Sequence, residues 1–137
     1  MEEKTHFQLS ASVNGGIVEI VITGEISKDD LDALQAEVIA ILREKNAKSS
    51  LCDVRDLKGP HDITGAYYRV RSIPADVKIL PSAVVDLSGN RDFQSFYETT
   101  AANVGQSIRF FSDIEAARAW LRNRLAAMGW KENEGSA

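Results

Sequence analysis

Residues 7–23, FQLSASVNGGIVEIVIT, decide how the fold begins. Over residues 7–13 apolar and polar side chains alternate, which is the pattern of a strand with one buried face. Asn14-Gly15 favours a tight hairpin turn, because both residues tolerate the positive φ that such a turn needs. The branched residues of 17–23 predict a second strand that is buried on both faces. The stretch therefore predicts an N-terminal β-hairpin.

Alternating helix and strand patterns follow the hairpin. Apolar residues at helical spacing predict helices, and short apolar runs between them predict further strands. The order β-β-α-β-α-β-α-β-α predicts an α/β fold with a mixed, mostly parallel sheet of about five strands, an N-terminal hairpin at its antiparallel edge and about four helices. The expected helices are about 28–46, 62–72, 93–104 and 114–128, and the expected strands are 50–54, 82–87 and 107–111.

Short polar residues mark where these helices begin. Ser27 is expected to cap the first helix and Asp62 the second. Ser112, followed three residues later by Glu115, has the pattern of a capping box for the last helix. Gly129 is expected to end that helix, because glycine readily adopts the left-handed conformation found there.

Composition and charge narrow the class of protein. The 137 residues carry 16 Lys and Arg against 20 Asp and Glu, a net charge of −4, which argues against a non-specific nucleic-acid-binding face. The single cysteine excludes an internal disulfide and is typical of a reducing compartment. Neither a membrane-spanning apolar run nor a secretory signal is present. We therefore expect a cytoplasmic protein with one domain over 1–137, a core in about 7–128 and a flexible tail at 131–137.

Several stretches resemble the SpoIIAA-like fold of STAS domains. They are ITGEISKDDLDAL (22–34), SLCDVRDLKG (50–59), SAVVDLSGNRDFQSF (82–96) and IRFFSDIEAARAWL (108–121). The chain most resembles the small stand-alone bacterial SpoIIAA-like proteins, which are often grouped with CRAL-TRIO lipid-binding domains. The resemblance extends over about residues 7–127 and implies a SpoIIAA-like fold.

The same resemblance suggests a phosphorylation site. STAS proteins that antagonise anti-sigma factors carry a phosphorylatable Ser or Thr where the helix after the third strand begins. The matching residues here are Asp62-Ile63-Thr64-Gly65, with Ile63 in place of a hydroxyl residue. The resemblance thus implies Thr64 as a phospho-acceptor and a kinase or anti-sigma-type protein as partner. The alternative is that Asp62 simply caps the helix.

The two middle helices are rich in aromatic residues and predict a ligand site. Facing each other across a crevice, they would suit an apolar or lipid-like ligand, and an exposed aromatic surface would suit peripheral membrane contact or a homodimer. The alternative is that these side chains pack into the core. The predicted ligand-binding residues are Tyr67, Tyr68, Phe93, Phe96 and Tyr97.

Two carboxylates fall near the ends of neighbouring strands. Asp53 and Asp86 would lie at the carboxyl edge of the sheet, where they could hold a divalent cation or act as an acid–base pair. The alternative is that they cap loops and pair with Arg55 or Arg91. Cys52 lies within a strand and is predicted to be a small core residue.

Nucleotide-binding, zinc-protease and serine-hydrolase motifs are absent. We therefore expect a non-enzymatic binding module without a cofactor or metal. It would bind an apolar or lipid-like ligand, or associate peripherally with a membrane, through the second and third helices. The alternative function is a regulatory partner-switch protein phosphorylated at Thr64.

Overall fold

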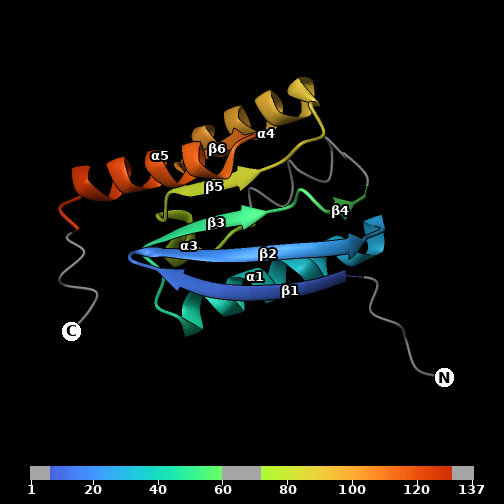
Figure 1. The fold of residues 1–137 in the computed structure, drawn as a ribbon, viewed down its shortest axis with the longest axis horizontal. Coiled ribbons are helices and arrows are strands. Elements are labelled where there is room, and N and C mark those ends of the chain that lie inside the picture. The colour runs from blue at the N-terminus through green and yellow to red at the C-terminus, as the bar shows by residue number, and fades with distance from the viewer. Residues whose placement is uncertain (1–6, 60–71, 131–137) are drawn as a thin grey trace.

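The computed structural model describes residues 7–59 and 72–130 (Figure 1). The strands are β1 (Phe7–Asn14), β2 (Ile17–Glu25), β3 (Ser49–Asp53), β4 (Leu57–Lys58), β5 (Ser82–Val85) and β6 (Ile108–Phe111). The helices are α1 (Leu31–Glu44), preceded by the 3-10 turn η1 (Lys28–Asp30), α3 (Ala75–Lys78), α4 (Arg91–Asn103) and α5 (Ile114–Ala127). The expected helix at 62–72 lies, except for Ser72, outside the described residues.

The N-terminal hairpin forms as predicted, but its turn lies one residue later than the expected Asn14-Gly15, because Asn14 is still paired with Ile17 and the turn residues are Gly15 and Gly16. β1 and β2 pair antiparallel in a register that runs from Phe7 opposite Gly24 to Asn14 opposite Ile17. Gly15 takes the positive φ of 62° that the turn requires. The expectation that β2 is buried on both faces was wrong at Val21, which is 37% exposed. The core on that face takes only Ile17 from β2 and leaves Val21 uncovered.

The sheet is mixed and mostly parallel, which confirms the predicted fold class. Its order is β1-β2-β3-β5-β6, and every neighbouring pair after the hairpin is parallel. The short β4 was not predicted. It continues the pairing of β2 beyond the end of β3, with Leu57 opposite Gly24.

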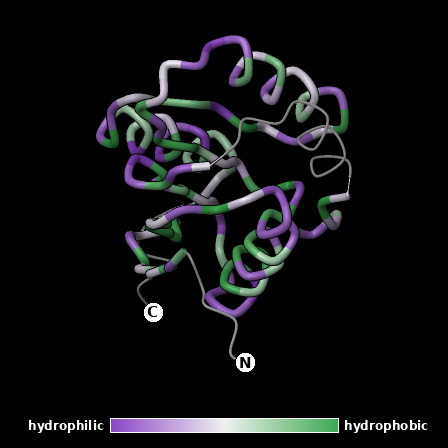
Figure 2. Tube along the Cα trace, turned by 90° about the vertical axis from the view of Figure 1, so that its right-hand side faces the viewer, coloured by the Kyte–Doolittle hydropathy of each residue, from purple (hydrophilic) through white to green (hydrophobic). Residues whose placement is uncertain are grey.

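Each face of the sheet packs against different helices. Alternate residues of β2 (Val18, Ile20 and Ile22) join Leu34 and Leu42 of α1 in one core cluster. The strand residues that point the other way pack against α5, which lies in front of the strands in Figure 1 while α1 lies behind them. Hydrophobic and hydrophilic residues alternate along the helices in Figure 2, as expected of helices with one buried face. The α5-side cluster is Ile17, Leu51, Ala83, Val85, Ala117, Leu121 and Leu125.

The helix ends differ slightly from the predicted ones. Asp113, not Ser112, caps α5, because its carboxylate accepts a hydrogen bond from Ala116 N at 2.9 Å. Ser27 begins the first helical segment as expected, and Asp30 Oδ2 accepts hydrogen bonds from its backbone N–H and its hydroxyl. Gly129 ends α5 with a φ of 87°, as predicted. The four-residue α3 was not predicted, since Pro74 and Pro81 indicated only a loop.

Candidate functional site

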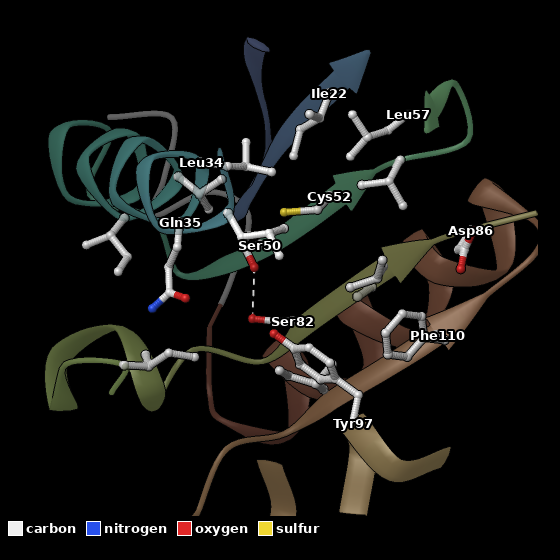
Figure 3. Close-up of a pocket in the computed structure, with 18 of the residues that line it drawn as sticks. Ile22, Leu34, Gln35, Ser50, Cys52, Leu57, Ser82, Asp86, Tyr97 and Phe110 are labelled. Atoms are coloured by element: carbon white, nitrogen blue, oxygen red, sulfur yellow. Dashed lines mark hydrogen bonds between the residues drawn. The ribbon is translucent and has the colours of Figure 1, made fainter. Parts of the chain in front are cut away.

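A cavity of about 320 Å³ lies on the α1 side of the sheet (Figure 3). Ser50 and Cys52 of β3 and Val84 of β5 belong to its floor. These positions are two residues apart along a strand or opposite each other in register, so they share one face of the sheet. The walls include residues of α1, α3 and α4.

Most of the lining is apolar. Leu34 and Val38 come from α1, while Ile22 and Leu57 come from β2 and β4. Leu34 is buried in the core, whereas Val38 and Leu57 are only partly covered. Aliphatic walls of this kind favour binding an apolar molecule, because its surface leaves water on entry.

Aromatic side chains close the cavity on the α4 side. Phe93 and Tyr97 lie one turn apart on α4, with ring centroids 5.9 Å from each other. Both meet Phe110 of β6 edge to face, at 6.4 Å for Phe93 and 5.7 Å for Tyr97. This tilted cluster holds α4 against the sheet edge and fixes the position of the aromatic wall.

Only some of the predicted aromatic residues lie in the part of the chain that the structure describes. Phe93 and Tyr97 line the cavity, as the sequence suggested. Phe96 is half-buried on the same helix and does not line it. Tyr67, Tyr68 and the phosphorylation candidate Thr64 lie outside the described residues, so their roles stay predictions.

Polar groups gather at the amino end of the strands. The Ser50 hydroxyl donates to Ser82 Oγ at 2.8 Å (Figure 3). The Ser82 hydroxyl donates to the Leu80 carbonyl at 3.3 Å. Gln106, just before β6, lines the same end of the cavity. Asp86 lies at the opposite end, ~13 Å along β5 from Ser82, since a strand rises ~3.3 Å per residue.

Cys52 lies on the floor of the cavity and carries a protonated thiol. Burial, and after it the repulsion of a thiolate by the neighbouring Asp53 carboxylate, raises the pKa of this thiol to about 12. A thiol in this state is a poor nucleophile. The prediction of a small core residue fits its packing against the α1-side cluster, although its side chain also reaches the cavity.

Asp53 and Asp86 are held by separate partners. Arg55 donates from Nε and Nη2 to the Asp53 carboxylate at 2.9 and 2.7 Å, and it holds the pKa of that carboxyl below its usual value. Asp86 accepts hydrogen bonds from the backbone and hydroxyl of Ser88 at 2.9 and 2.8 Å. Each carboxylate thus stabilises a loop. This agrees with the interpretation of the two residues as loop caps and not as a cation or acid–base site. The described residues contain no group of three or more His, Cys, Asp or Glu that could hold a metal ion.

Sequence reasoning missed the floor and the α1 wall of the cavity. The signal was present in the alternation of each strand, because Ser50, Cys52, Ser82 and Val84 share one parity. The sequence did not indicate on which face of the sheet a cavity forms. The missed lining residues include Leu34, Val38, Ser50, Ser82, Gln106 and Phe110.

Comparison with solved structures agrees with this architecture. An uncharacterised protein of the DUF3478 family with a SpoIIAA-like fold, from Shewanella loihica, matches with a TM-score of 0.53 and 16% identity over 88% of this chain and 98% of its own. An anti-sigma factor antagonist from Mycobacterium paratuberculosis matches with a TM-score of 0.56 and 13% identity over 85% and 94%. The chain has a SpoIIAA-like fold. At this identity the likeness concerns the SpoIIAA-like fold alone.

Comparisons at the level of sequence give no relatives. No family model matches the chain, and no curated protein matches it. Within residues 7–59 and 72–130, no helix of this SpoIIAA-like chain is long and apolar enough to cross a membrane.

Proposed function

We propose that this SpoIIAA-like protein is a non-enzymatic binding module that takes a small apolar molecule into the cavity between α1 and α4. The observation that carries the proposal is the cavity itself. Its volume of about 320 Å³ lies at the lower end of the ~300–1,000 Å³ typical of small-molecule sites. Its walls are aliphatic and aromatic, with a few polar groups at the two ends.

The chemistry of the lining supports binding rather than catalysis. The two carboxylates that first suggested chemistry are engaged by Arg55 and Ser88. The thiol of Cys52 has a raised pKa and is therefore held in its unreactive form. An apolar ligand would gain ~25 cal/mol for each Å² of apolar surface removed from water, which is a sufficient source of affinity for a small molecule.

The test uses the uncharged dye N-phenyl-1-naphthylamine, which fluoresces strongly in apolar surroundings. We expect saturable binding to the wild-type chain. Val84→Phe places a ring on the cavity floor and should weaken binding at least tenfold. The matched control is Val13→Phe, because Val13 is 60% exposed on β1 and distant from the cavity lining.

Two results would contradict the proposal. One is the absence of saturable dye binding by a folded wild-type protein. The other is equal weakening by Val84→Phe and Val13→Phe, which would place the dye elsewhere. If Val84→Phe does not fold, Val38→Phe on the facing wall of α1 replaces it.

A second candidate function is a regulatory partner-switch phosphorylated at Thr64. The structural similarity to an anti-sigma factor antagonist favours it. It predicts that Thr64→Glu changes binding to a kinase-like or anti-sigma-type partner, because a negative charge is added to the docking surface. Mass spectrometry of protein from its own host, grown under several stresses, should find phosphate on Thr64. Consistently unmodified Thr64 would count against this function.

A further inference from the structure

The strand β1 forms one edge of the sheet. Within the part of the chain that the structure describes, it pairs with β2 alone, and the sheet order ends there (Figure 1). The pairing matches one residue with one residue along the whole strand, so no β-bulge interrupts it. An edge of this kind offers a row of N–H and C=O groups to another strand.

The hairpin turn decides which backbone groups of β1 point away from β2. Asn14 and Ile17 flank the two-residue turn at Gly15 and Gly16, and such a turn closes with a hydrogen bond between its flanking residues. Hydrogen-bonded and non-hydrogen-bonded pairs then alternate along the antiparallel ladder. The N–H and C=O groups of the odd-numbered residues therefore face the open edge. These residues are Phe7, Leu9, Ala11 and Val13.

The sequence of β1 lacks the features that commonly keep an edge strand from pairing. Those features are charged side chains, proline, bulges and short length. β1 has eight residues, FQLSASVN, and none of them is charged or a proline. Val13, near the end of the strand, is apolar and yet 60% exposed. The strand is therefore suited to pair with a further strand.

The opposite edge of the sheet is protected. β6 has only four residues, and one of them is the exposed and charged Arg109. The Glu98 carboxylate on α4 accepts a hydrogen bond from Phe110 N at 2.8 Å, so this N–H of β6 is already used. The contrast between the two edges indicates that β1, and not β6, is the strand that meets a partner.

The residues of β1 favour a second copy of this chain as the partner. Two copies of β1 can pair antiparallel about a two-fold axis at Ser10. Phe7 then lies opposite the partner's Val13, a favourable pair of an aromatic and a β-branched side chain. Leu9 lies opposite the partner's Ala11, and no like charges face each other along the strand. Association then stops at two copies, because the edges that remain are the protected β6 strands.

We propose that the chain forms a symmetric dimer in which β1 pairs antiparallel with β1 of a second copy, so that one sheet continues through both. Main-chain hydrogen bonds from the odd-numbered residues hold the two copies together, and the exposed Val13 becomes covered. One strand pair buries little surface, so we expect association of micromolar strength. The interface lies outside the cavity lining, and the inference is therefore independent of the proposed function.

Sedimentation equilibrium of the full chain, from micromolar to millimolar concentration, tests the dimer. We expect the mean mass to rise from that of one chain toward that of two. Ala11→Pro removes an N–H that faces the open edge and leaves the hydrogen bonds to β2 in place, so it should weaken dimerisation at least tenfold. Wild-type protein that stays monomeric at every concentration overturns the proposal. Dimerisation that folded Ala11→Pro leaves unchanged also overturns it.

Charges at Ser10 test the position of the axis, and they remain available if Ala11→Pro does not fold. Ser10→Lys and Ser10→Glu each place like charges opposite each other, and each should weaken dimerisation up to roughly fivefold at low salt. A mixture of the two variants brings opposite charges together and should dimerise more tightly than either variant alone. Ser95→Lys and Ser95→Glu, at an exposed position on α4, are the matched controls and should leave dimerisation unchanged. A mixture that dimerises no better than its components contradicts the proposed pairing.

Discussion

Arg118 of α5 holds both carboxylate oxygens of Glu19 on β2, although the two residues are 99 positions apart in the chain. Its Nε and Nη2 each lie 2.8 Å from an oxygen of Glu19. Asn14 adds a third hydrogen bond at 3.1 Å, and Glu115 contacts the same guanidinium. Glu19 is only 7% exposed and the Arg118 side chain is 24% exposed, so this largely buried ion pair joins the N-terminal hairpin to the last helix.

Removal of Arg118 should destabilise the fold substantially. Arg118→Met leaves the buried Glu19 carboxylate without its counter-charge, and we expect a loss of about 3 kcal/mol in the free energy of unfolding. The control is Arg43→Met. Arg43 pairs with Asp76 on the surface with side chains 52% and 58% exposed, so its loss should cost less than ~1 kcal/mol. Urea unfolding of both variants measures the difference, and equal losses would contradict a buried role for the Arg118 pair.

The same ion pair predicts how stability depends on pH. Hydrogen bonds from Arg118 and Asn14 hold the pKa of the Glu19 carboxyl below its usual value, against the opposing effect of burial. The folded protein therefore releases this proton more readily than the unfolded chain does. The contribution of Glu19 is fully present above the usual glutamate pKa of about 4.3, and it is lost as the pH falls through the lower folded value.

Glu19→Gln isolates that contribution, because the other carboxylates are common to both proteins. At neutral pH the variant should be less stable than wild type, and the difference should shrink as the pH is lowered toward about 3. Thermal unfolding at a series of pH values checks this. A difference that stays constant with pH would show that the loss arises from packing and not from the charge.

The hairpin, the parallel strands and the final helix could be read from the sequence because their signals are local. Alternation in 7–13 and the turn-forming residues 14–16 specify one pairing, although the turn itself uses Gly15 and Gly16, and the apolar spacing of α5 specifies one buried face. β4 and α3 escaped prediction because they are held by long-range contacts. β4 is only two residues long, and it exists because β2 extends past β3.

The candidate site was less accessible to sequence reasoning. Phe93 and Tyr97 were found because aromatic residues one helical turn apart stand out in the sequence. Gln106 was not, because nothing local distinguishes it from a surface glutamine. Its burial follows from the turn after α4 and from the pairing of β5 with β6, so its place in the cavity lining emerges only from the tertiary fold.

Gly16 allows the hairpin to approach α5 closely. A methyl group at this position would lie 3.0 Å from Leu125 Cδ1 and 3.0 Å from Trp130 Cε2. Gly16→Ala should therefore cost about 1–3 kcal/mol of stability through overpacking. In the background of Leu125→Val, which makes room, the same change should cost less. An equal cost in both backgrounds, measured by urea unfolding, would show that the contact with Leu125 is not the cause.

The thiol of Cys52 reports on the cavity directly. Because its pKa is raised to about 12, the native protein should react with 5,5′-dithiobis(2-nitrobenzoic acid) roughly a thousandfold more slowly than an unhindered cysteine of pKa ~8.5. Cys52 is the single cysteine in the chain, so the released colour counts this site alone. Unfolding in urea should restore the ordinary rate.

Saturation with N-phenyl-1-naphthylamine should slow the native reaction further, because the dye would cover a residue that lines the cavity. A native rate that equals the unfolded rate would contradict the burial of Cys52, and a rate unchanged by bound dye would place the dye outside this cavity.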